Sequence, residues 1–302
     1  MNGMVSYNVP HFFGEGLVPW GMLIVIHFFL SGMAAGSFIA SAAASYLDDE
    51  KYKKIASAGA YLALFSIMVD VPILILDLDR PLRFITLLFR GSITAPLTWG
   101  TWFLIGLGLF SLLNIALQRG MEAVRGFKPV ILVIGSVFAI GVSAYTAVAL
   151  NIATDARPIW SNGAVIPVFM VASLVAGIAA VSLVVSLTGP AKGLSSLNTA
   201  NAVLLLFQLL LVAFLLLTAS TSSQLGREAA GEILGGELSF IFWAGLVVIG
   251  LAVPVIVFWS NLLAKVTEPR AGMTALISAM VLLGVFALRY IIVYGGQIIP
   301  LT

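Results

Sequence analysis

The 302-residue chain has no cysteine. Iron–sulfur clusters and zinc–thiolate sites depend on cysteine thiolates, so neither can be held by this protein. Histidine is nearly absent as well, because His11 and His27 are the two that occur. His11 precedes the first apolar stretch, which leaves His27 alone inside the apolar spans. A haem held between two intramembrane histidines is therefore excluded.

Charge is also scarce. Charged residues make up 9% of the chain and hydrophobic residues 61%, and the mean hydropathy is +1.11. Soluble domains carry about 25% charged residues, so this composition places the chain in a lipid bilayer. The net charge of +2 rests on few residues and predicts no nucleic-acid partner, which would require clustered Lys and Arg.

Long apolar stretches are what the sequence does contain. A helix needs about 20 apolar residues to cross roughly 30 Å of hydrocarbon. Eight stretches are long enough, at residues 18–46, 55–77, 97–117, 129–151, 163–187, 202–220, 239–263 and 272–294. The sequence therefore predicts an all-α, polytopic membrane protein with eight transmembrane helices. We expect two four-helix bundles, residues 18–151 and 152–302, after an N-terminal extracytoplasmic segment of residues 1–17.

The loops predict an orientation. Lys and Arg are more numerous in the loops on one side of the predicted helices than on the other. The positive-inside rule places the richer loops in the cytoplasm, and both termini outside it. Most of the tryptophans then fall at the outer side, where we expect an ordinary aromatic belt. These are Trp20, Trp99, Trp102, Trp160 and Trp243.

Few strongly polar side chains interrupt the spans: His27, Asp70, Asp77, Tyr145 and Arg289. An ionisable residue inside the hydrocarbon is costly and marks a functional site by default. Counted from the helix ends, His27, Asp70 and Tyr145 lie at one level, about 10 Å below the outer surface. For Arg289 we expect the side chain to snorkel to the outer rim.

An imidazole and a phenol at that depth suit a quinone head group, which has two carbonyls at opposite ends of an apolar ring. We expect His27 and Tyr145 each to bond one carbonyl, while apolar burial supplies the affinity. Asp70 and Asp77 are seven residues apart and so share one helix face. They predict a ladder of carboxylates that passes protons to the outer rim.

The second and fourth spans both end in an Arg-Pro pair shortly after an aspartate, at Arg80-Pro81 and Arg157-Pro158. Proline cannot continue a helix, so each pair stops a span and leaves an arginine near the outer rim.

Together these residues carry a family resemblance. The run HFFLSGMAAG at 27–36, Asp70 with DLDRP at 77–81, and Ser143-Ala-Tyr145 before the second Arg-Pro resemble the NrfD/PsrC family. Members of this family are the membrane subunits of polysulfide-reductase-type complexes. The resemblance covers the eight-helix plan, and its specific matches lie in the first four helices. The polar Asn that the family has four residues before the histidine corresponds here to Leu23.

The resemblance implies a non-haem, quinone-reactive subunit of a multi-subunit oxidoreductase in a prokaryotic cytoplasmic membrane. Such a subunit binds menaquinone or ubiquinone as an exchangeable substrate and is not a complete enzyme alone. An iron–sulfur, ferredoxin-like subunit docks on the extracytoplasmic side and links it to a molybdopterin-type catalytic subunit. The resemblance assigns His27 and Tyr145 to the quinone and Asp70 to the proton path. We expect Arg80 and Arg157 at the rim that faces the docked partner.

A different class of function stays open at this stage. In a secondary transporter or ion-translocating module, Asp70, Asp77 and Arg289 would bind a coupling ion or substrate. Such proteins have Gly- or Pro-interrupted helices near the midplane, and Pro72 interrupts the second span close to Asp70.

Overall fold

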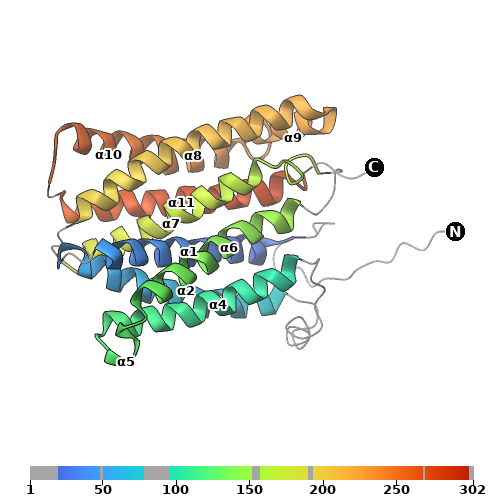
Figure 1. Cartoon of the computed structure of the whole chain (residues 1–302). Helices are drawn as coiled ribbons and strands as arrows, with labels where there is room; N and C mark the ends of the chain where they lie inside the picture. Colours follow the sequence, from blue (N-terminus) through green and yellow to red (C-terminus); the bar gives the residue numbers. More distant parts are fainter. Residues whose placement is uncertain are drawn as a thin grey trace.

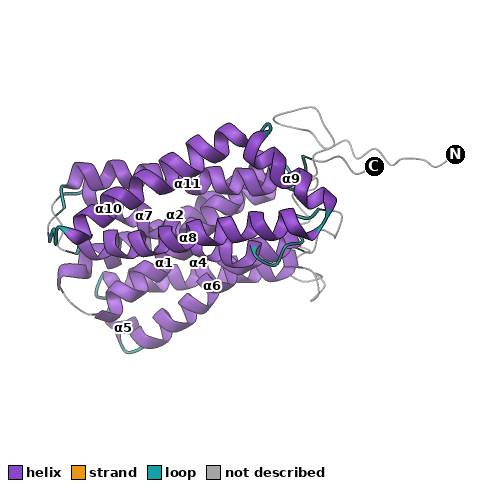
Figure 2. Cartoon of the chain, turned by 90° about the horizontal axis from the view of Figure 1, so that it is seen from above, coloured by secondary structure: helices purple, strands orange, loops and turns teal. Residues whose placement is uncertain are grey.

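The computed structural model describes residues 20–47, 50–77, 96–151, 157–189, 193–267 and 269–298. The predicted N-terminal segment 1–17 and Arg80 lie outside these residues. Throughout the described part, the regular structure consists of helices without strands, joined by short connections (Figure 2).

Eight long apolar helices run roughly side by side, as predicted (Figure 1). They are α1 (Met22–Leu47), α2 (Lys53–Asp77), α4 (Pro96–Gln118), α6 (Lys128–Asn151), α7 (Val165–Leu187), α8 (Leu194–Ser222), the π-helix η3 (Ile241–Ala252) continued by α10 (Val253–Leu263), and α11 (Ala271–Gly295). Three short elements connect them: η1 (Glu50–Tyr52), α5 (Glu122–Arg125) and α9 (Gln224–Gly235). The molecule is an integral, multi-pass membrane protein.

The sixth span differs from the sequence prediction. The prediction began it at residue 202, whereas α8 already begins at Leu194 and includes Asn198 and Asn201. Both asparagines are buried, so they face neighbouring helices rather than ending the span. Helix α9 was not predicted. It has one buried face, which includes Ala229 and Ile233, and lies at the end of the molecule where α1 begins (Figure 1).

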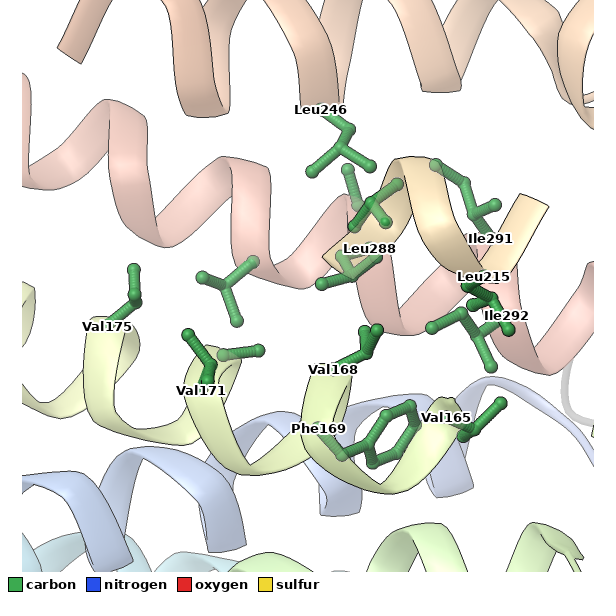
Figure 3. Close-up of a cluster of buried hydrophobic side chains, with 14 of the residues drawn as sticks. Val165, Val168, Phe169, Val171, Val175, Leu215, Leu246, Leu288, Ile291 and Ile292 are labelled. Carbon is green, nitrogen blue, oxygen red and sulfur yellow. The ribbon is translucent and has the colours of Figure 1, made fainter. Parts of the chain in front are cut away.

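The apolar interior is built around two sets of helices. One cluster joins α1, α2, α4 and α6, with Phe38 and Leu107 fully buried. A larger one joins α7, α8, η3 and α11 and also takes in residues of α1 and α6. Figure 3 shows part of it, where Val168 and Phe169 of α7 lie among side chains from neighbouring helices. The division into two bundles at residue 152 stays a prediction.

Glycine permits a close crossing of α1 and α7. A Cβ built on Gly177 would overlap the backbone of Gly36 and Ser37, and one built on Gly36 would overlap Ser173. Small residues let membrane helices approach until their backbones touch, and dispersion then stabilises the contact. This crossing joins the two sets of helices.

Arg289 corrects a prediction, because its side chain does not reach the rim. It is fully buried, and its Nη2 donates to the carbonyl of Phe169 and to the hydroxyl of Ser173, both at 3.0 Å. The guanidinium also lies over the Phe169 ring, 3.8 Å from the centroid. Gly32 leaves room for the guanidinium of Arg289, since a Cβ at residue 32 would lie 3.1 Å from Nη2. Hydrogen bonding and cation–π contact hold the cation inside, which sequence position alone did not predict.

The α1–α7 crossing yields a stability prediction. Gly177→Ala adds one methyl group against a backbone, so we expect overpacking to lower the free energy of unfolding by about 1–3 kcal/mol. Gly272→Ala is the control, because nothing lies within 4 Å of a Cβ at that position. Thermal unfolding in detergent measures both, and equal midpoints for the two variants would contradict the close crossing.

Candidate functional site

Three polar side chains from three helices form one hydrogen-bonded chain. Nδ1 of His27 on α1 lies 2.8 Å from Oδ1 of Asp70 on α2. On the other side of the ring, Nε2 of His27 lies 2.6 Å from the hydroxyl of Tyr145 on α6. All three side chains are buried, and Asp70 is fully inaccessible. The structure thus brings together the three residues that the sequence placed at one level.

The groups at the two ends of this hydrogen-bonded chain, the Asp70 carboxylate and the Tyr145 phenol, indicate which atoms donate the hydrogen bonds. A carboxylate can only accept, so the Nδ1 proton of a neutral imidazole points to Asp70, and the phenol donates to Nε2. A further proton taken up at Nε2 would make an imidazolium already paired with the Asp70 carboxylate. The arrangement can therefore accept and return a proton while the charge stays compensated.

The partners of His27 differ from the sequence expectation in one respect. We expected His27 and Tyr145 each to contact a separate ligand atom, but in this structure they bond to each other. A ligand that bonds Nε2 must therefore compete with the Tyr145 hydroxyl, or else bond the phenol oxygen and act through it.

A small cavity opens beside these three residues. Its volume is about 120 Å³, and it is lined mostly by apolar side chains from α1, α2, α4 and α6. The lining residues are Trp20, Ile24, His27, Phe28, Leu74, Asp77, Leu97, Thr101, Tyr145 and Ala149. Pockets that enclose whole drug-sized ligands measure about 300–1,000 Å³. This cavity is smaller than that, so it can enclose only part of such a ligand, and the remainder must lie outside it.

The cavity lies near one end of the helices. His27 is five residues from the start of α1, and Tyr145 is six from the end of α6, so each lies about 8–9 Å from its helix end. Asp77 is the last residue of α2 and lines the cavity, whereas Asp70 lies behind His27. The Asp70 carboxylate therefore lies on the interior side of His27, and the Asp77 carboxylate lies at the helix end, in the cavity wall. Their role as a proton ladder stays a prediction.

Two stacked tryptophans lie at this end of the helices, and one of them, Trp20, lines the cavity. Trp20 stacks on Trp160 at a centroid distance of 5.2 Å, and its ring meets that of Phe28 edge to face. Trp160 is 1% exposed, and its Nε1 donates to the carbonyl of Ile292. The aromatic-belt prediction is therefore wrong for Trp160, because its N–H is satisfied by α11 rather than by water.

Further contacts hold this pair. Arg157 lies over the Trp160 ring, 5.1 Å from its centroid, and donates to the carbonyl of Gly296 at 2.8 Å. Partial burial lowers the pKa of the Arg157 guanidinium. Gln297 accepts from the backbone N–H of Trp20 and donates to the carbonyl of the same residue. Arg157 thus supports the site structurally, and its predicted role in partner docking stays a prediction.

Sequence reasoning missed Trp20, Phe28 and Thr101 as residues of this cavity. Trp20 could have been found, because it precedes His27 by seven residues, about two helical turns. The described residues contain no group of three or more His, Asp and Glu that could hold a metal ion. Arg289 bonds to α7 rather than to Asp70, so the polar residues do not converge as the transporter hypothesis requires.

Comparison with known proteins agrees with this architecture. Residues 12–300 match the family described as "Polysulphide reductase, NrfD". A polysulfide reductase chain of Wolinella succinogenes is 28% identical, over 93% of this sequence and 95% of its own. A selenate reductase subunit of Mesobacillus selenatarsenatis is 25% identical, over 93% and 74%. The Hdr-like menaquinol oxidoreductase integral membrane subunit of Archaeoglobus fulgidus is 23% identical, over 99% and 77%.

Since the family match spans nearly the whole sequence and all eight helices, this chain belongs to the NrfD family of polysulfide reductase membrane subunits.

Proposed function

We propose that this protein is the quinone-reactive membrane subunit of a respiratory oxidoreductase complex and exchanges electrons with a docked iron–sulfur subunit. The observation that carries the proposal is the hydrogen-bonded chain Asp70–His27–Tyr145, which ends in a small, mostly apolar cavity. A quinone ring needs this combination of apolar walls with a group that takes or returns a proton.

Quinol oxidation at this site requires two proton acceptors and one electron outlet. The head group enters the cavity, and one of its hydroxyls bonds at the His27–Tyr145 end. As two electrons leave for the partner, one proton goes to Nε2 of His27, where Asp70 compensates the charge. The second goes to Asp77, which also lines the cavity. Quinone reduction follows the same path in reverse, and the isoprenoid tail stays in lipid.

The partners follow from what the sequence lacks. Without cysteine or paired histidines, it has no residues to hold an electron relay of its own, so the nearest cluster of the partner must approach the cavity. We place a ferredoxin-like subunit, followed by a molybdopterin-type catalytic subunit, on the extracytoplasmic side, where the positive-inside rule predicts both termini. The relatives named as parts of polysulfide and selenate reductases support such a complex. The menaquinol oxidoreductase relative favours menaquinone.

His27→Ala removes the proton acceptor and both hydrogen bonds at the centre of the site. We expect the purified complex to lose oxidation of a short-chain menaquinol analogue, followed by absorbance, while its subunits stay associated. Wild-type turnover in an intact His27→Ala complex would contradict the assignment.

Tyr145→Phe keeps the ring and removes the hydroxyl alone. We expect turnover to fall by about 10²-fold, the lower range for loss of a proton-transfer group. Tyr290→Phe is the matched control, because Tyr290 stacks on Tyr294 in α11 and does not line the cavity. If both variants turn over equally fast, Tyr145 is a packing residue.

Asp70→Asn leaves the imidazole a hydrogen-bond partner but removes the compensating charge. We expect the turnover rate to fall while the affinity for the analogue, measured by quenching of tryptophan fluorescence, changes little. Glu228→Gln on α9 controls for a general effect of removing a carboxylate. A loss of affinity at unchanged maximal rate would assign Asp70 to binding instead of proton transfer.

A further inference from the structure

A second, larger cavity lies at the end of the helices opposite the candidate site. Its volume is about 890 Å³, and its wall includes Ser45 of α1 and Gln118 of α4. Ser45 is 18 residues beyond His27 on the same helix, about 27 Å along the axis of the roughly 30 Å of hydrocarbon. Helix α5, which contributes Arg125 to the wall, lies at the end of the molecule away from α9 (Figure 1). The two cavities therefore lie near opposite surfaces of the membrane.

Cations dominate the wall of this cavity. Its cationic residues are Lys53, Lys54, Arg125 and Lys128. Glu50 is the carboxylate among the described wall residues, and it forms an ion pair with Lys53. The described wall thus carries four cations against one carboxylate, and such a concentration of one sign of charge attracts an anion.

The excess of cations remains when neighbouring acids are included. Asp48 and Asp49 precede Glu50 and lie outside the described residues. Counting both with the wall leaves four cations against three carboxylates. Arg125 is exposed and has no ion-pair partner among the described residues. Its guanidinium is therefore available to a phosphate, which arginine binds through two parallel hydrogen bonds.

Two long helices begin at this cavity. Helix α2 begins at Lys53 and α6 at Lys128, and both residues line the wall. The first N–H groups of a helix have no acceptor within the helix, and the positive end of its dipole lies there. A helix start therefore favours a bound anion, so the backbone and the cationic side chains of this wall attract the same kind of ligand.

Hydrogen bonds between helices fix the shape of the wall. Gln118, the last residue of α4, donates to Ser45 of α1 at 2.7 Å. The next residue, Arg119, donates through Nε to the hydroxyl of Tyr61 of α2, also at 2.7 Å. The end of α4 is thus bonded to both neighbouring helices. Because the wall is already formed, a ligand loses little free energy in ordering it.

The size and position of the cavity favour a phospholipid headgroup over a small ion. Its volume lies within the range of about 300–1,000 Å³ for pockets that enclose drug-sized ligands, so a phosphate and its glycerol fit together. Leu117 and Met121 add apolar surface to the wall. Further into the spans α2 exposes Phe65 and Met68, which suits contact with acyl chains. Basic pockets between transmembrane helices on the cytoplasmic side bind anionic lipid headgroups.

We infer that this cavity binds the phosphate headgroup of an anionic phospholipid, with Arg125 and Lys128 bonded to the phosphate oxygens. The positive-inside rule predicts this end in the cytoplasm, where the leaflet carries anionic lipids. The bound lipid connects α5 with the starts of α2 and α6 and so stabilises the first set of helices. The inference is independent of the proposed quinone chemistry, which takes place at the other end.

Binding of defined lipids to the full-length chain tests this inference. The chain is purified in detergent, depleted of lipid and titrated with one of three ligands. Phosphatidylglycerol is anionic, phosphatidylcholine carries a phosphate without net charge, and inorganic phosphate has no acyl chains. Native mass spectrometry counts the bound molecules, and thermal unfolding measures the stabilisation.

We expect phosphatidylglycerol to bind more tightly than phosphatidylcholine and to raise the unfolding midpoint, and inorganic phosphate to leave the midpoint unchanged. Arg125→Gln and Lys128→Gln should each weaken phosphatidylglycerol binding about fivefold, the fold-change that corresponds to about 1 kcal/mol for one cation near an anionic lipid. Arg125→Gln breaks no ion pair among the described residues, so it serves even if Lys128→Gln folds poorly. Arg270→Gln is the matched control, because Arg270 is exposed at the start of α11 and does not line the cavity.

Equal binding of phosphatidylglycerol to the Arg125→Gln, Lys128→Gln and Arg270→Gln variants would overturn the site. Equal affinity of the wild-type chain for the two lipids would overturn it too, because the cations would then not select the ligand. If inorganic phosphate alone raises the midpoint and displaces the lipid, the cavity is a site for a soluble phosphate instead. None of these measurements uses quinol oxidation, so a negative result leaves the proposed function standing.

Discussion

The structure depends on one constraint, that an ionisable side chain in hydrocarbon needs partners close by. Burial of Asp70 is possible because one of its carboxylate oxygens is hydrogen-bonded to Nδ1 of His27. The second ring nitrogen of His27 is hydrogen-bonded to Tyr145. Each bond fixes one helix against the next, so α1, α2 and α6 are registered by the same atoms that form the site. Function and assembly therefore share their strongest polar contacts.

Arg289 meets the same constraint in the other set of helices. Nη2 of its guanidinium is bonded to one carbonyl and one hydroxyl, and the group lies over one ring face, while Nε and Nη1 have no partner among the described residues. The first set of helices pairs an acid with a base, whereas the second encloses a cation among neutral groups. This difference is a chemical asymmetry between the two sets.

Much of this could be predicted from sequence. Hydropathy identified all eight spans, because a long apolar run has few alternatives to a membrane helix. Residue type and depth brought His27, Asp70 and Tyr145 to one level. Sequence could not predict that these residues bond to one another or that Arg289 turns inward. Those outcomes depend on helix rotation and on which neighbour lies opposite, which is set by packing rather than by position in the sequence.

The two hydrogen bonds between Trp20 and Gln297 have a consequence for biosynthesis. Trp20 precedes α1 and Gln297 follows α11, so all eight long helices must be made before the two residues meet. Until then, Trp20, whose indole lines the cavity, lacks the two hydrogen bonds that hold its backbone. Its stacking on Trp160 is then not stabilised by Gln297. The cavity wall is thus completed only after residue 297 has been made, and a protein truncated before Gln297 would keep the eight helices yet leave that wall unsecured.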